Sequence, residues 1–117
     1  MKYKSIITSI GILVPDFLNE KMMIIFNNNA PKELEEMSVL HTIVEFDQKI
    51  EVGDIFVIGE KKYKVTAVGD DANKTFKELG HCTLKFTGRH EVELPGQIEL
   101  LGDEIPKIKI GDILGIL

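Results

Sequence analysis

The sequence has a single cysteine, no cluster of basic residues and no long apolar run. Cys82 therefore cannot form a disulfide within the chain, which fits a protein of the reducing cytoplasm. The 14 basic residues are scattered among 19 acidic ones, and the net charge of -5 argues against binding nucleic acid through its phosphates. The apolar run of residues 5–14 is interrupted by serine, threonine and glycine, unlike a signal peptide, and no later stretch could span a bilayer.

Several catalytic motifs are also missing. No Gly-x-Ser-x-Gly segment indicates a hydrolase nucleophile. Residues 69–75 lack the second glycine of a phosphate-binding loop, and their aspartates would repel phosphate, so a helix cap is favoured there. His81 and Cys82 are neighbours that would point to opposite faces of a strand, and no zinc-type ligand spacing is present. The sequence thus assigns no nucleotide, metal or hydrolase site.

The 117 residues, 44% of them hydrophobic and 28% charged, fit one soluble globular domain that spans residues 1–117. Turn signals recur at short intervals, which is typical of an all-β protein. Nine strands are expected, at residues Lys4–Gly11, Lys21–Phe26, Ser38–Phe46, Ile55–Ile58, Lys62–Val68, Cys82–Phe86, Glu91–Leu94, Gln97–Leu101 and Ile113–Leu117. Because closure removes exposed edges, we predict a small, mainly antiparallel, closed or nearly closed β-barrel.

One or two short helices interrupt the strands. The first would begin at Pro31, and the second would run from an N-cap at Asp70 or Asp71 to a stop at Gly80. Hairpin turns are expected at residues 59–62 and at residues 87–88. Residues 49–58 resemble residues 107–116, and turn chemistry shared by two barrel corners explains this echo better than a functional repeat.

The three histidines are the remaining candidates, since imidazole can act as a base, a metal ligand or a phosphoryl acceptor near neutral pH. His90 follows a turn, and no role is assigned to it. In a strand through residues 38–46, His41 shares a face with Val39 and Ile43, and the other face is the more apolar. We therefore expect His41 on the less buried face. Spacing alone leaves open whether it is a structural histidine or a functional one.

Three segments add a more specific signal: Leu34–His41, Thr66–Gly69 and Glu78-Leu-Gly-His-Cys-Thr-Leu-Lys-Phe-Thr-Gly88. Together they resemble the glucitol/sorbitol-specific IIA component of the bacterial phosphoenolpyruvate-dependent sugar phosphotransferase system. The resemblance covers essentially the whole chain. It implies that His41 is the phosphorylated residue. Some relatives have a second histidine two positions later, where this chain has Ile43, so His81 becomes the natural candidate for a supporting residue.

The resemblance implies a cytoplasmic phosphocarrier that needs no metal or organic cofactor. It would accept a phosphoryl group from the carrier protein HPr and pass it to the IIB component of a glucitol-type IIB/IIC permease. Hydrogen-bond donors such as Thr42, Thr83 or His81 would hold the phosphoryl oxygens. A semi-exposed His41 ringed by Val39 and Ile43 would form the docking face. The alternatives are a non-catalytic binding or regulatory barrel with a structural His41, and a metal-dependent enzyme.

Overall fold

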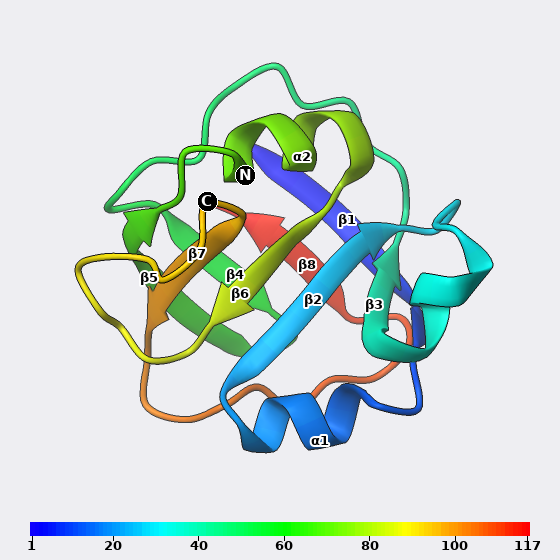
Figure 1. Ribbon diagram of the computed structural model, residues 1–117. Coiled ribbons are helices and arrows are strands. Elements are labelled where there is room, and N and C mark those ends of the chain that lie inside the picture. Colours follow the sequence, from blue (N-terminus) through cyan, green and yellow to red (C-terminus); the bar gives the residue numbers. More distant parts are fainter.

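A computed structural model, which describes all 117 residues, shows eight strands closed into one barrel (Figure 1). Around the barrel the strands follow the order β1-β3-β2-β6-β7-β5-β4-β8, and β8 pairs with β1 to complete the ring. The strands are β1 (Tyr3–Ile10), β2 (Met22–Asn27), β3 (Ser38–His41), β4 (Ile55–Ile58), β5 (Lys61–Val68), β6 (Cys82–Lys85), β7 (Gln97–Leu101) and β8 (Ile113–Ile116). The predicted closed all-β barrel is confirmed.

Six of the eight strand pairings are antiparallel, as predicted, and two are parallel. β4 and β5 form the expected hairpin, with Gly59 in its turn at a φ of 60°. The parallel pairs are β2 with β3 and β6 with β7, and each needs a crossover connection. The hairpin predicted at residues 87–88 and the strand predicted at residues 91–94 are therefore wrong, because the chain crosses over after β6.

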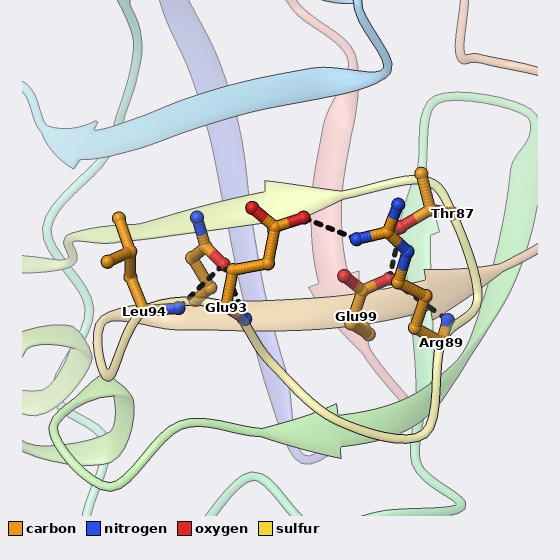
Figure 2. Close-up of polar contacts among 6 residues, drawn as sticks. Thr87, Arg89, Glu93, Leu94 and Glu99 are labelled. Carbon is orange, nitrogen blue, oxygen red and sulfur yellow. Dashed lines mark hydrogen bonds and ion pairs between the residues drawn. The ribbon is translucent and has the colours of Figure 1, made fainter.

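Two side chains of β7 hold this crossover, residues 86–96, against the barrel (Figure 2). Glu99 Oε1 accepts hydrogen bonds from the Thr87 hydroxyl (2.5 Å) and from the Arg89 backbone N–H (3.1 Å). Gln97 Oε1 accepts two more, from backbone N–H groups of the same loop (3.1 and 3.2 Å). These four bonds take the place of the sheet pairing that a strand would have made.

Three short helices accompany the barrel: α1 (Val14–Asn19), the 3-10 helix η1 (Lys32–Met37) and α2 (Ala72–Leu79). In Figure 1, α2 lies above the strands and α1 lies below them. No helix combines the length and the apolar character that crossing a membrane requires.

The helix predictions are partly confirmed. α2 ends as expected, with Gly80 in the left-handed conformation, whereas the side chain of its N-cap residue Asp71 makes no capping bond. Pro31 is the N-cap of η1 and not its first residue. α1 was not predicted. Proline is tolerated in a first helical turn, where its missing N–H would have had no partner, and Pro15 occupies this position.

The two similar segments, residues 49–58 and 107–116, form the same turn twice. Gly53 and Gly111 both have a φ of 97°. The next residues bond back in the same way, since Asp54 Oδ2 accepts from the N–H of residue 51 (2.8 Å) and Asp112 Oδ2 from that of residue 109 (3.0 Å). The interpretation as a shared β-turn is confirmed.

The repeat extends beyond these turns to the order of the elements. Apart from η1, which has no counterpart in the second half, β1-α1-β2-β3-β4 matches β5-α2-β6-β7-β8, and exchanging the halves leaves every strand pairing unchanged. β1 and β3 pair with an irregularity between Ile7 and Ser9, and β5 and β7 pair with one between Val65 and Ala67. The barrel therefore has approximate twofold internal symmetry.

Twenty-two buried apolar side chains form one contiguous core. Near β3 this core contains three aromatic rings in edge-to-face contact, those of Tyr3, Phe46 and Phe76. Their centroids lie 4.9 to 5.4 Å apart, within the favourable range for such pairs. Tyr3 connects this aromatic cluster to the candidate site, because its hydroxyl contacts His41.

Candidate functional site

His41 is the last residue of β3 and lies between β1 and β2, opposite Ile7 and Asn27. Its exposed fraction is 0%, so the expectation of a less buried, semi-exposed histidine is wrong. The predicted alternation of faces through residues 38–46 is wrong because the strand ends at His41 and does not continue to residue 46. Val39 and Phe46 both belong to the core although an odd number of positions separates them, which one continuous strand does not allow.

The expected docking face is wrong for the same reason. Val39 is fully buried, and only Ile43, with an exposed fraction of 56%, reaches the surface. After His41 the chain makes a last pair of bonds to β1. The Thr42 N–H donates to the Ile6 carbonyl (3.0 Å), and the Thr42 hydroxyl accepts from the Ile6 N–H (3.0 Å). The Thr42 side chain thus ends the ladder by substituting for a backbone carbonyl.

Both ring nitrogens of His41 have close polar neighbours. Nε2 lies 2.8 Å from the carbonyl oxygen of Gly80. Nδ1 lies 3.0 Å from the carbonyl oxygen of Thr42 and 3.2 Å from the hydroxyl of Tyr3. Burial lowers the pKa of His41, and the Gly80 and Thr42 carbonyls oppose that shift. The neutral ring that burial favours has an available lone pair, which the cation lacks.

The close approach of Gly80 depends on its being glycine. It ends α2 at a φ of 61°, a conformation that other residues rarely adopt. A Cβ atom at this position would lie 2.0 Å from Asn27 Oδ1 and 2.8 Å from His41 Cε1. The helix end can therefore meet the imidazole only without a side chain.

His81 lies next to the site, but its ring makes no hydrogen bond to that of His41. Its Nδ1 lies 3.0 Å from the carbonyl oxygen of Ile25, and because a carbonyl only accepts, Nδ1 carries the hydrogen. The His81 ring also packs on Phe26 at a centroid distance of 4.6 Å. The structure thus connects the two predicted site residues only through Gly80, which precedes His81 in the chain and whose carbonyl oxygen contacts Nε2 of His41.

The remaining candidates lie elsewhere or are occupied. His90 is exposed on the crossover loop. Cys82 is buried, and burial raises the pKa of its thiol, so it is an unreactive filler. No group of three or more His, Cys, Asp or Glu side chains is arranged to hold a metal ion. Two surface hollows have volumes of about 360 and 450 Å³. The first is lined by residues 60–61, 107–109 and 112 and the second by residues 89–93, and neither includes His41.

Sequence reasoning missed Tyr3 and the carbonyl of Gly80 as neighbours of the ring. A signal for Tyr3 was present, because Tyr3, Ser5 and Ile7 alternate on one buried face of β1 and a buried tyrosine hydroxyl usually has a partner. The partner could not be predicted, since Tyr3 and His41 lie 38 residues apart in sequence and their side chains meet only in the folded barrel.

Comparisons with known proteins agree with this fold. A family model described as PTS system glucitol/sorbitol-specific IIA component matches residues 2–115. The glucitol/sorbitol-specific EIIA components of Shigella flexneri and Escherichia coli K12 are each 38% identical over 112 residues, covering 96% of this chain and 91% of the relative. The crystal structure of a PTS IIA component from Enterococcus faecalis V583 is 30% identical, with a TM-score of 0.84 over 95% of this chain and 96% of that one.

Proposed function

This chain belongs to the family of glucitol/sorbitol-specific IIA components of the sugar phosphotransferase system (PTS), and we propose that His41 is the residue on which it carries the phosphoryl group. A IIA component is a phosphocarrier, one step of a phosphotransferase relay and not a complete enzyme alone. The observation that supports His41 is its environment. It is a buried histidine in which burial favours the neutral, nucleophilic form and backbone groups fix the ring.

In the proposed reaction an imidazole nitrogen of His41 attacks the phosphohistidine of HPr. A P–N bond forms on His41 as the P–N bond of the donor breaks, and the electron pair of the broken bond returns to the donor nitrogen. His41 then gives the group to a cysteine thiolate of the IIB component. Transfer between two histidines is nearly isoenergetic, so positioning and charge stabilisation matter more than bond-breaking power.

The buried ring has to become accessible at one nitrogen. Nδ1 faces Tyr3, whose ring is packed against Phe46 and Phe76, whereas the hydrogen-bond partner of Nε2 is the Gly80 carbonyl at the end of α2. We infer that the phosphoryl group reaches Nε2 when the segment around Gly80 moves aside. His81 would then support transfer through its bond to the Ile25 carbonyl, which anchors this segment to β2.

The finer assignments follow from family membership and are part of the proposal. Residues 1–117 act as one IIA domain in the cytoplasm. Phospho-HPr is its donor, a glucitol-type IIB/IIC permease is its acceptor, and glucitol (sorbitol) is the transported sugar. The acidic net charge of -5 would favour a basic donor surface.

The test is phosphoryl transfer followed by intact mass. The protein is incubated with phosphoenolpyruvate, enzyme I and HPr, and we expect one acid-labile phosphoryl adduct. His41→Gln should abolish the adduct, because the amide cannot replace the nucleophilic nitrogen. His90→Gln, the same change on the exposed loop, should leave it in place. An unlabelled wild type beside a labelled control IIA protein, or a labelled His41→Gln variant, would refute the assignment.

The alternative is a structural His41 in a barrel that binds or regulates a partner. The complete burial of the ring, with polar contacts at both nitrogens, is the observation that favours it. The same experiment separates the two, because a structural His41 predicts that wild type takes up no phosphoryl group.

A further inference from the structure

The contacts of the His41 ring do not suit a neutral imidazole unless Tyr3 takes part. Two of the three neighbours are carbonyl oxygens, those of Gly80 at Nε2 and Thr42 at Nδ1, and carbonyls only accept hydrogen bonds. A neutral imidazole has one N–H and can satisfy only one of them. The cation has two and would satisfy both. The backbone by itself therefore favours the protonated ring, which cannot act as a nucleophile.

Of the three neighbours, only the Tyr3 hydroxyl has a hydrogen to give. We propose that Tyr3 is a positioning residue that keeps His41 neutral, by donating its hydroxyl hydrogen to Nδ1 while Nε2–H donates to the Gly80 carbonyl. The 2.8 Å contact at Nε2 is the shortest of the three and fits a donated hydrogen bond. The consequence of this arrangement for catalysis rests on the proposed function of His41.

Tyr3 is itself held for this role. Its ring is nearly fully buried, packs edge-on against Phe46 and Phe76, and meets the His41 ring at 86° with a centroid distance of 6.3 Å. Its backbone pairs with Ile116 of β8. Burial raises the pKa of Tyr3, so its hydroxyl keeps the hydrogen that it donates.

No ion pair competes with this arrangement. The nearby titratable groups are Tyr3 on β1, His81 directly after Gly80 and Cys82 on β6, and β2 contributes the uncharged Asn27. No carboxylate or amine is among the causes that shift the pKa of His41, which are burial and the two carbonyls. Burial therefore favours the neutral ring, the two carbonyls oppose it, and the Tyr3 hydroxyl is the one neighbour whose hydrogen bond can offset them.

The same neighbours allow the neutral ring to change tautomer in place. With its hydrogen on Nδ1, the ring donates to the Thr42 carbonyl and leaves an electron pair on Nε2. Once the Gly80 carbonyl moves away, that pair can form the new P–N bond, and the hydrogen stays on Nδ1. Tyr3 and Thr42 thus provide Nδ1 with a donor for one tautomer and an acceptor for the other.

Tyr3→Phe tests the proposal, because it removes the hydroxyl and keeps the aromatic packing. NMR titration of labelled His41 should show protonation at higher pH than in wild type, since the ring then faces two acceptors and no donor. Phosphoryl acceptance at mildly acidic pH should fall by about three- to tenfold, the worth of one neutral hydrogen bond, and should recover as the pH rises.

Tyr63→Phe is the matched control. Tyr63 is an equally buried tyrosine of the same barrel whose hydroxyl donates to the carbonyl of Glu104 (2.6 Å), away from His41. It should leave the titration of His41 and the pH profile of phosphoryl acceptance unchanged. The same two profiles for folded Tyr3→Phe and wild type would overturn the role of Tyr3.

A measurement on wild type keeps the proposal falsifiable even if Tyr3→Phe does not fold. Nitrogen NMR should find Nδ1 of His41 unprotonated and Nε2 protonated at neutral pH, and a hydrogen on Nδ1 would overturn the proposal. The failure of the proposed function has a different signature. In that case wild type takes up no phosphoryl group on His41, whereas the ring titrations still decide whether Tyr3 keeps it neutral.

Discussion

The burial of His41 gives the folded protein a titration that differs from that of the unfolded chain. The pKa of His41 is lowered by burial in the folded state, whereas the unfolded chain has the ordinary value of 6.5. Between the two pKa values the unfolded state binds more protons. The stabilising effect of the neutral buried ring is therefore complete above pH 6.5 and is lost as the pH falls toward the lowered pKa of the folded state.

We expect the free energy of unfolding to decline as the pH falls below 6.5, and His41→Gln to remove this part of the decline. Urea unfolding at a series of pH values measures both proteins. The comparison is made within each protein, so a general loss of stability in the variant does not affect it. Parallel pH profiles for the two proteins would show that His41 does not titrate differently on folding.

The sequence singled out His41 and His81 as candidates because their motifs resemble those of a known family, and it missed the contacts that surround the His41 ring. The Tyr3 hydroxyl and the Gly80 carbonyl reach the ring from positions 38 and 39 residues away in sequence. Such neighbours follow from strand order and register, which local periodicity does not contain. The burial of His41 was missed for a related reason, since a period of two assumes that the strand continues.

The end of α2 is the element on which the site depends most. Gly80→Ala should destabilise the protein by about 2 to 4 kcal/mol, because it adds left-handed backbone strain and a clash with Asn27 and His41. It should also reduce phosphoryl acceptance, because the helix end can no longer hold the imidazole. Thermal or urea unfolding and the mass assay measure the two effects.

Gly53→Ala is the control for backbone strain alone. Gly53 also has a positive φ, 97°, but nothing lies within 4 Å of the added methyl group. We expect a loss of about 1 kcal/mol and unchanged phosphoryl acceptance. Equal losses of stability in the two variants would mean that the tight packing of Gly80 against the ring contributes little.

Elements with a local signal were predicted well, and those defined by distant partners were not. The hairpin of β4 and β5 follows from its own turn residues, including Gly59, and its strands lie within one residue of the predicted ranges. The crossover after β6 has similar turn residues, yet β6 pairs in parallel with β7. The side chains of Glu99 and Gln97 then accept hydrogen bonds from the backbone of the loop, and no residue near Gly88 in the sequence predicts these bonds.

The approximate symmetry of the barrel does not extend to His41, which has no histidine counterpart in the second half. In the pairing with β1, His41 is the residue opposite Ile7, just before the irregularity, and the matching pair in the second half is Leu100 with Val65. Leu100 is fully buried in the apolar core. The first half therefore has a histidine where the second half has a leucine, and we expect one phosphoryl adduct per chain.

The pairing of β1 with β8 has a consequence for how the chain can be cut. It places the two chain ends side by side, with the Lys2 N–H bonded to the Ile116 carbonyl (2.8 Å), and Figure 1 shows both ends near the same strands. The matching junction in the other half is the turn at Gly59 between β4 and β5. The β1–β8 and β4–β5 pairs are thus equivalent junctions of the barrel. The chain ends lie at the first, and a turn connects the strands at the second.

A circular permutant that joins residue 117 to residue 1 through a short glycine-serine linker and opens between Gly59 and Glu60 should fold. We expect its melting temperature within about 10 °C of wild type and its phosphoryl acceptance preserved, because exposed hairpin turns tolerate new ends. A permutant opened between Leu79 and Gly80 should lose transfer, since it frees the helix end that holds His41. If instead only the second permutant accepted the phosphoryl group, the barrel would not tolerate chain ends at the β4–β5 turn. The two junctions would then not be equivalent, whereas we expect them to be interchangeable.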